Sequence, residues 1–561
     1  MSARSSLQYD LASTTGFNDP NIFVNRNWLT INDDIQNYSA HQSRFSTSSI
    51  SASKFINWST GYIDVPLMLN MVGNLSPATA TSSCDFALAL KNGFHSMVHS
   101  IQISINGNSV INATPHINMW NNFKLMQNLS FNELKTLSHI GFYPPNRRAF
   151  VYQSSASVDG IGTCLNRNAG AFDVVSGAHA SAGTYNDGMV ERQHAIVYDA
   201  DGLTAPSASA FSTLLTKNAV AQMYKSHVFN KVNDNTNGCY QLAVSAQIPL
   251  KNLHSIFEQL PLIRSMFMEI VISWNQTSHT ISVGSGGSMT CTDALTTSPL
   301  GGVSPLLFAS KNTGSGNAST LQNNTNYTIS INVGNKPINN TVVANPNVVN
   351  SPLNQQCTLH LESLTMSPNY ESAYLKDPVK EVYFEDVYSY QVKNIASQGT
   401  FDQLISVGLA GLQSILIIPY YTSSSNGSLS PIYSPFSEEG ASTGSPLAHI
   451  REFQVKVAGE NQLMKTSAYT YETYLEQLHG ERSINSNLTS GLGSGLVSKE
   501  DFELFPNYYC NLSYMHPNDV NIPKSVSIQG LNASAKPIDL YVFVSFKRRM
   551  KVDSITGMVL E

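Results

Sequence analysis

Charged residues are scarce in this sequence. Only 12% of its 561 residues are Asp, Glu, Lys or Arg, against roughly 25% in a typical soluble domain. The 32 basic and 38 acidic side chains leave a formal net charge of −6, with no long basic run. A dedicated nucleic-acid-binding protein carries a basic patch, so we expect no sequence-specific nucleic-acid binding. The short basic cluster Lys547 to Lys551 is predicted to be a solvated strand end, the alternative being a contact with phosphate or an acidic partner.

Cysteine pairs, a secretory leader and long apolar runs are also missing. The six cysteines are scattered, and none stands in a Cys-x-x-Cys spacing, which favours free thiols over a disulfide framework or a zinc site. Residues 1–6 lack the apolar segment of a signal peptide, so we expect synthesis in the cytosol. The most apolar run, Val407 to Tyr421, is interrupted by Gln413 and is shorter than the ~20 residues that span a bilayer. We predict a buried strand pair there.

Motifs for covalent chemistry are nearly absent. Gly440–Gly444 matches the nucleophile-elbow pattern, but it lies in a Ser/Gly/Pro-rich loop without the strand and helix that an elbow needs. His95 and His99 would share one face of a strand, with no third metal ligand near them in sequence. Asp199–Gly202 lacks the other positions of a calcium loop, and Gly491–Gly495 lacks the last glycine of a dinucleotide fingerprint. We therefore assign no catalytic, cofactor-binding or metal-binding residue and expect no cofactor.

What the sequence does contain is a strand, tight turn and helix written twice. Residues 101–107 and 453–459 alternate apolar and polar side chains and end in glycine, at a constant offset of 352 (453 − 101 and 459 − 107). Alternation is typical of a half-buried strand, and the glycines supply the positive φ of a hairpin turn. Apolar residues then recur at helical spacing through 119–126 and 471–478. One β-rich unit has therefore been used twice.

A second pair of matching segments predicts a long insertion. Cys239 and Cys510 stand in similar strand-like segments at an offset of 271 (510 − 239), and we match the strand at 266–272 with the one at 540–546. The first unit then has 81 more residues (352 − 271) between its helix and its next strand. They fall within 139–238, which is rich in Ser, Ala, Gly and Asn and is predicted to form large surface loops.

These patterns predict a mainly β chain with two units and a few short helices. Residues 1–50 are rich in Ser, Asn, Asp and Gln, with apolar residues too sparse for a core, and are expected to form an N-terminal arm. The first unit would span 51–366 and carry surface loops at 139–238 and 284–356. The second unit would span 367–561.

Several segments in both halves resemble one protein family. Residues 86–100, FALALKNGFHSMVHS, lead into the first hairpin and helix, and residues 248–262 combine Ile-Pro-Leu with Ile-Phe-Glu-Gln-Leu-Pro-Leu. In the second half, Pro-Phe-Ser at 435–437 is followed by the strand at 453–459. These segments are similar to those of double jelly-roll major capsid proteins, above all those of polinton-like viruses and virophages.

The resemblance implies a specific architecture and role. The fold would be two tandem eight-stranded antiparallel jelly rolls, and a homotrimer would form a pseudo-hexagonal capsomer of an icosahedral shell. The partners implied are neighbouring capsomers, penton proteins and minor or cement proteins, with host-surface contact through the outer loops. The location implied is the capsid of the virion, after synthesis in the host cytoplasm.

Two other classes of function stay open at this point. One is a tandem jelly-roll hydrolase acting on glycans or glycopeptides, which needs paired carboxylates, one with a raised pKa. The candidate acids are Glu381, Glu385 and Asp386, or Glu438 and Glu439, although adjacent acids on a strand point to opposite faces. The other is a lectin-like binding module or a spike protein.

Overall fold

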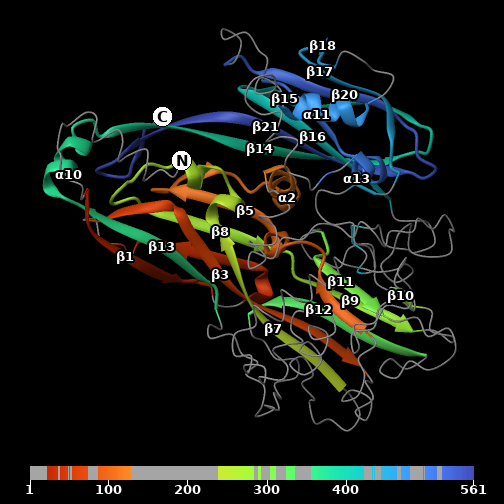
Figure 1. Ribbon diagram of the computed structural model, residues 1–561, viewed down its shortest axis with the longest axis horizontal. Helices are drawn as coiled ribbons and strands as arrows, with labels where there is room; N and C mark the ends of the chain where they lie inside the picture. Colours follow the sequence, from red (N-terminus) through yellow and green to blue (C-terminus); the bar gives the residue numbers. More distant parts are fainter. Residues whose placement is uncertain are drawn as a thin grey trace, which may run out of the picture.

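Figure 1 shows the computed structural model of the chain. The structure describes the following residues: 22–35, 38–48, 50, 54–73, 86–128, 238–283, 289–291, 303–310, 324–334, 356–422, 432, 433, 435, 444, 445, 447–463, 469–479, 497, 499–513 and 521–560. Two β units are joined by a short helix, α10 (Pro368–Leu375).

The second unit is a complete jelly roll. Its eight strands, in chain order, are β14 (Val379–Ile395), β15 (Thr400–Leu409), β16 (Leu412–Tyr421), β17 (Ile450–Val457), β18 (Glu460–Asn461), β19 (Tyr508–Asn511), β20 (Lys524–Asn532) and β21 (Ile538–Asp553). One sheet has the order β14-β21-β16-β19 and the other β15-β20-β17-β18. Counted one to eight, these orders are 1-8-3-6 and 2-7-4-5, the double Greek key of a jelly roll. A two-residue strand, β22 (Val559–Leu560), pairs with β21.

The first unit repeats this order with additional strands. Its eight jelly-roll strands are β1 (Phe23–Asn32), β2 (Gln42–Ser46), β3 (Phe55–Gly73), β5 (Val98–Ile105), β6 (Asn108–Ile111), β7 (Gly238–Pro249), β8 (Met268–Trp274) and β13 (Thr358–Met366). They form the sheets β1-β13-β3-β7 and β2-β8-β5-β6, the same 1-8-3-6 and 2-7-4-5 orders. The expected tandem of two eight-stranded jelly rolls is therefore confirmed.

Additional strands occupy part of a predicted loop. Strands β9 (Thr277–Val283), β10 (Met289–Cys291) and β12 (Thr325–Val333) extend the first sheet beyond β3, and β11 (Leu306–Ser310) pairs with β4 (Phe86–Leu90). The prediction of a surface loop over 284–356 is therefore wrong for β10, β11 and β12, which lie within that range. In these strands, polar Asn, Ser and Thr residues alternate with apolar ones. On β12 the apolar residues are Tyr327, Ile329 and Ile331, and all three are buried. The loop predicted at 139–238 lies outside the described residues, apart from its last residue.

The short helices lie between strands and at the ends of the sheets. They are α2 (Ile117–Asn128), α8 (Leu250–Leu253), α9 (Ile256–Gln259), α11 (Tyr471–His479) and α13 (Lys499–Leu504), with two 3-10 turns, η1 (Tyr38–Ala40) and η2 (Phe94–Met97). No helix in the part of the chain described above is long and apolar enough to cross a bilayer.

The internal repeat is confirmed in detail. Strands β5 and β17 begin 352 residues apart (450 − 98), and each turns back through two residues of positive φ. These are Asn106 at 49° and Gly107 at 83° in the first unit, and Ala458 at 52° and Gly459 at 88° in the second. Helices α2 and α11 follow the two hairpins, as the change of period predicts.

The second predicted match is half right. Cys239 and Cys510 lie on β7 and β19, which occupy the same place in the two jelly rolls. The strand at 266–272, however, belongs to β8, whose counterpart is β20, whereas 540–546 belongs to β21, the counterpart of β13. Alternating apolar residues identify a half-buried strand but not its neighbours in the sheet. The sequence pattern therefore matched β8 with β21, the strand that follows its true counterpart β20.

The expected N-terminal arm is wrong for the described part of residues 1–50. Strand β1 pairs with β13 in a continuous ladder from Asn25 to Asn32, and β2 pairs with β8. Ile31 and Phe45 lie in the core. Strands at the edge of a sheet need only one buried face, so a polar, Asn-rich segment can still be an integral strand.

The run Val407 to Tyr421 forms two strands, as predicted, but they do not pair with each other. Strand β15 pairs with β20 in one sheet, and β16 pairs with β19 and β21 in the other. The chain crosses between the sheets through Gly411, which has a φ of 68°. Within β16, nine of ten residues are buried, because both faces of this sheet are covered.

Candidate functional site

The first unit covers the outer face of β16. The interior of the second unit packs residues such as Ile415, Val455 and Val542 between its two sheets. The outer face of β14, β21 and β16 instead joins the hydrophobic cluster of the first unit, through Val382, Phe384, Ile418, Phe543 and Val552 among others. Helix α2 lies between β5 and the second unit in Figure 1. The two jelly rolls are therefore fused through a buried interface, which is the candidate functional site.

Side chains from the first unit satisfy the backbone at the free edge of β14. This strand is the last of its sheet, and such an edge leaves unpaired N–H and C=O groups. The Ser255 hydroxyl donates to the Glu385 carbonyl (2.6 Å) and accepts from the Glu385 N–H (3.0 Å). Two residues further, Thr114 Oγ1 donates to the Val387 carbonyl (3.0 Å). The edge is thus capped by hydroxyl groups rather than by another strand.

A buried carboxylate anchors the middle of this interface. Asp386 Oδ2 accepts a hydrogen bond from Arg548 Nη1 (2.9 Å), and Asp386 Oδ1 accepts one from the Val387 N–H (2.8 Å) and lies 3.6 Å from His254 Nε2. Arg548 Nη1 also reaches the Val110 carbonyl of β6 (2.6 Å). Arg548 therefore links β21 of the second unit to the hairpin of the first.

The surroundings of Asp386 favour its ionised form. Burial raises the pKa of this carboxyl, but His254 and Arg548, together with the Val387 N–H, outweigh burial and hold the pKa below its usual value. The Nδ1 atom of His254 accepts the Ile256 N–H (3.2 Å), so the ring proton sits on Nε2, facing Asp386. The imidazole of His254 and the guanidinium of Arg548 thus surround one carboxylate.

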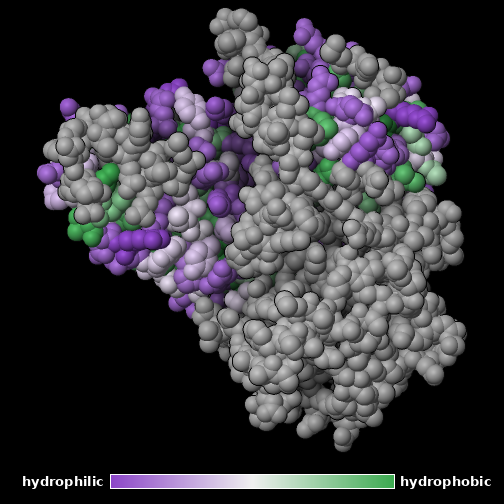
Figure 2. Space-filling model, in the orientation of Figure 1, coloured by the Kyte–Doolittle hydropathy of each residue, from purple (hydrophilic) through white to green (hydrophobic). Residues whose placement is uncertain are grey.

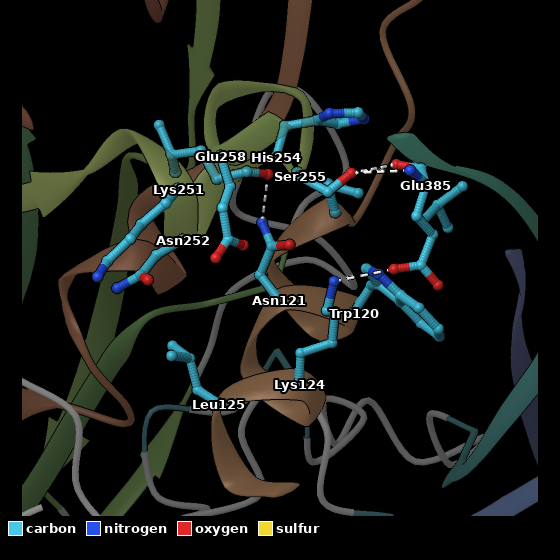
Figure 3. A pocket seen from close by; sticks show the side chains of 13 residues that line it. Trp120, Asn121, Lys124, Leu125, Lys251, Asn252, His254, Ser255, Glu258 and Glu385 are labelled. Carbon is cyan, nitrogen blue, oxygen red and sulfur yellow. Dashed lines mark hydrogen bonds and ion pairs between the residues drawn. The ribbon is translucent and has the colours of Figure 1, made fainter. Parts of the chain in front are cut away.

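A small cleft opens beside this contact (Figure 3). It has a volume of about 170 Å³ and is lined by α2, the α8–α9 segment and β14. Lys124 Nζ on α2 pairs with Glu385 Oε2 (2.9 Å), and Asn121 Nδ2 donates to the Leu253 carbonyl (2.9 Å). Drug-sized ligands occupy pockets of about 300–1,000 Å³. The cleft is too small for such a ligand, and its polar groups already bridge the two units.

Three aromatic side chains form a second polar contact between the units. The rings of His99 and His116 meet edge to face at 5.0 Å, and His116 meets Tyr541 of β21 at 5.1 Å. Burial lowers the pKa of His99 to about 4, and burial, His99 and Lys393 lower that of His116 to about 3. Both imidazoles are therefore neutral at pH 7.

The predicted pairing of His95 and His99 on one strand is wrong. His95 lies in η2, where its Nε2 is 2.9 Å from Asn122 Oδ1, and only His99 is on β5. Among the residues that the structure describes, no group of three His, Cys, Asp or Glu side chains could hold a metal ion. Cys357 and Cys510 are buried free thiols, each with its pKa raised by burial to about 12, so both are unreactive.

Two of the candidate carboxylates of a hydrolase, Glu381 and Asp386, are each held in an ion pair with an arginine. Glu381 is exposed and forms an ion pair with Arg549, which together with Tyr383 lowers the pKa of this carboxyl. A general acid of a glycosidase needs a raised pKa, whereas the pKa values of Glu381 and Asp386 are both lowered. Glu438 and Glu439 lie outside the described residues.

The basic cluster Lys547 to Lys551 is partly solvated, as predicted, since Lys547 and Arg549 are exposed, but its side chains also have partners within the chain. Arg548 enters the interface, Lys551 Nζ lies 3.6 Å from Glu381, and Lys547 Nζ stands 5.1 Å from the Tyr383 ring centroid. The other motifs tested, Asp199–Gly202, Gly491–Gly495 and all but the last residue of Gly440–Gly444, lie outside the described residues.

Sequence reasoning missed the residues that join the units. Arg548 and Asp386 are 162 positions apart, and Thr114 and Val387 are 273 apart. One signal in the sequence could have indicated a buried ion pair. Asp386 stands two positions after the apolar Phe384, so a charged side chain shares a face of the strand with an apolar one. Its partner could not be named without the fold.

Comparison with known proteins finds similarity only in three dimensions. No protein-family model and no curated protein matches the sequence. A chain of the Sputnik virophage structure at 3.5 Å is 10% identical, with a TM-score of 0.49 over 97% of this chain and 90% of that one. The mavirus major capsid protein is 10% identical, with a TM-score of 0.42 over 95% and 89%. The Faustovirus major capsid protein is 10% identical, with a TM-score of 0.41 over 98% of each chain.

Proposed function

We propose that this protein is the structural subunit of an icosahedral viral shell. The observation that carries the proposal is the fusion of two jelly rolls of identical strand order through a buried, hydrogen-bonded interface. Closed sandwiches protect their sheet edges, and a duplicated unit lets three chains present six similar modules. The resemblance of residues 86–100 and of the hairpin segments to double jelly-roll capsid proteins supports the same role.

In this proposal the working form is a homotrimer. Three chains of two modules each give a pseudo-hexagonal outline from exact three-fold symmetry. Such capsomers would tile the capsid of a virion and contact neighbouring capsomers, penton proteins and minor or cement proteins. The protein is proposed to act without covalent chemistry, in keeping with the lowered pKa values of Glu381 and Asp386.

The mass of the purified protein tests the proposal. Light scattering after size exclusion should give three times the chain mass of 61.2 kDa, and negative-stain electron microscopy should show hexagonal capsomers. A monomer at micromolar concentration with no capsomers would refute the proposal and favour a monomeric enzyme or lectin.

The insertion in the first unit is proposed as the outward contact surface. The chain between α2 and β7 is 81 residues longer than the one between α11 and β19, since residues 129–237 are set against 480–507. This excess contains the segment 151–190, which is rich in Ser, Ala, Gly and Asn. Proteases acting on intact particles should cleave preferentially within 151–190. Cleavage confined to Lys547–Lys551 would place the opposite end of the module outside.

A further inference from the structure

Three polar side chains meet inside the first unit, at the strands that are additional to its jelly roll. His279 lies on β9, Cys291 on β10 and Ser304 just before β11. The Nε2 atom of His279 is 2.7 Å from Ser304 Oγ, and its Nδ1 atom is 3.8 Å from Cys291 Sγ. One imidazole therefore lies between a thiol and a hydroxyl group.

Backbone pairing fixes this arrangement. Cys291 stands opposite Ile281 in the ladder between β9 and β10. His279 precedes Ile281 by two residues, so its side chain shares a face of the sheet with that of Cys291. The Ser304 N–H donates to the Ile432 carbonyl (3.2 Å). The three groups are thus held in place by separate elements of the fold, which lowers the entropic cost of a reaction between them.

Cys291 differs from two other thiols of the chain in its exposure. Cys357 and Cys510 are completely buried, whereas Cys291 is 8% exposed. It also lies on β10, the last strand of its sheet, beside β9 and β11 in Figure 1. Burial raises the pKa of the Cys357 and Cys510 thiols to about 12. These two cysteines therefore serve as internal references for an unreactive thiol.

The imidazole is placed to take the proton of the thiol. When the Nε2–H of His279 donates to Ser304, the lone pair of Nδ1 faces the Cys291 thiol. Transfer of the thiol proton to Nδ1 gives a thiolate beside an imidazolium, whose Nε2–H still bonds to Ser304. The thiolate is the nucleophilic form of cysteine, and a neighbouring histidine is one of the groups that produce it.

We propose that Cys291 is a reactive thiol that exchanges with small-molecule disulfides, with His279 as its base and Ser304 as the residue that positions the imidazole. The thiolate attacks one sulfur of the disulfide, so that a new S–S bond forms to Cys291 while the S–S bond of the reagent breaks. The leaving thiolate takes the proton from His279, and no other oxidant is needed. This exchange is separate from the proposed capsomer, whose assembly requires no covalent step.

Disulfide exchange is the reaction for which these three groups suffice. It needs a thiolate and a proton donor, whereas acyl transfer also needs donors aimed at an oxyanion. The small exposed fraction of Cys291 favours a compact reagent. Hydrophilic residues dominate the described part of the face in Figure 2, so a short, water-soluble disulfide such as cystamine is a suitable probe.

Labelling with iodoacetamide, followed by mass spectrometry of the peptides, measures the reactivity of each thiol. In the native protein Cys291 should react roughly ten times faster than Cys357 and Cys510, or more, and its rate should be half-maximal below about pH 8.5, the value of a free thiol. Equal rates for the three thiols, or a half-maximal rate at or above this pH, would overturn the inference. This measurement needs no variant, so it stands even if a substitution prevents folding.

Substitution of the histidine separates activation of the thiol from its exposure. His279→Gln should slow the labelling of Cys291 at pH 7 roughly tenfold or more and move the half-maximal rate to higher pH. Ser304→Ala should shift it less in the same direction, since this residue only positions the ring. Slow labelling of Cys357 and Cys510 in each variant shows that it is folded. A folded His279→Gln variant with an unchanged pH dependence would refute the role of His279.

Cystamine tests the exchange itself. The native protein should form one mixed disulfide at Cys291, which dithiothreitol reverses and which Cys291→Ser does not form. Labelling of Cys291 by iodoacetamide without exchange with cystamine would contradict the proposed reaction. The oligomeric state of the same samples, measured by light scattering, tests the capsomer independently, so either proposal can fail while the other stands.

Discussion

Individual buried polar residues hold the two jelly rolls together. Asp386 meets a guanidinium, an imidazole and a backbone N–H inside an otherwise apolar contact. Removing one partner of such a group leaves the others buried without compensation, which costs more than the contact itself contributes. The contribution of this cluster is therefore best measured at Asp386.

Asp386→Ala is expected to lower the free energy of unfolding by about 2–4 kcal/mol, because Arg548 and His254 lose their anion. Urea denaturation at pH 7 measures this change. Glu381→Ala is the matched control, since Glu381 pairs with Arg549 at an exposed position on the same strand, and it should change stability little. Equal effects of the two substitutions would show that Asp386 is not a special anchor.

The buried histidines predict weaker stability at mildly acidic pH. An unfolded histidine binds a proton near pH 6.5, whereas the folded pKa of His99 is about 4 and that of His116 about 3. The unfolded state thus binds more protons between pH 6.5 and about 4, so stability is full above pH 6.5 and falls as the pH falls through this window. The loss by pH 5 should be on the order of 2 kcal/mol for each histidine.

Urea denaturation at pH 7 and pH 5 measures this loss. His99→Leu should reduce the difference between the free energies of unfolding at pH 7 and pH 5. Leucine can still pack against the neighbouring ring, but it cannot bind a proton. An unchanged difference in this variant would assign the acid sensitivity to other groups. Asp386 does not affect stability within this window. Because its pKa is lowered in the folded state, its contribution to stability is lost only below about pH 4.

At the scale of single elements, the hairpin turns are equivalent in the two units. Gly107 and Gly459 both have positive φ and no atom within 4 Å of an added Cβ, so alanine at either costs only backbone strain. The loop residue Gly444 is different, because an added Cβ would lie 2.4 Å from the Pro506 carbonyl oxygen.

Gly107→Ala and Gly459→Ala should each lower the free energy of unfolding by about 1–2 kcal/mol. Gly444→Ala should cost clearly more, because backbone atoms on both sides must move. Thermal denaturation of the three variants provides the comparison. A mild effect at Gly444 would indicate that the neighbouring loop adjusts freely.

Strand β1 is an element of the core rather than an appendage. It bonds to β13 from Asn25 to Asn32 and buries Ile31. A truncation that removes residues 1–32 should therefore abolish folding of the first unit, because β13 would lose one of its two neighbouring strands along its whole length. Circular dichroism and limited proteolysis test this expectation. A truncated protein with an unchanged unfolding transition would show that β1 is dispensable.

At the scale of the whole molecule, the second unit depends on the first to cover one of its sheets. Val382, Phe384, Ile418 and Phe543 belong to the hydrophobic cluster of the first unit. Residues 367–561 produced alone should therefore expose this face, bind a hydrophobic dye and aggregate. Dye fluorescence and light scattering measure both effects. A monodisperse, non-binding fragment would mean that the interface contributes little to stability.

The sequence by itself determined the local elements and their duplication. Alternating apolar residues at 101–105 and 453–457, each followed by a turn glycine and a helical period, are properties of neighbours along the chain. The hairpins and the helices α2 and α11 therefore stand where the pattern predicts them. The scarcity of charge and the family resemblance added the fold class.

Only the tertiary structure decided how these elements combine. Strand β1 is too polar to be recognised as core, because most of its residues are exposed and only Ile31 is buried. The assignment of 540–546 to β21, and the meeting of Asp386, His254 and Arg548, depend on contacts between residues more than a hundred positions apart. Hydrophobic periodicity reports which face of a strand is buried and not what buries it, so partners within a sheet and between units are settled by packing alone.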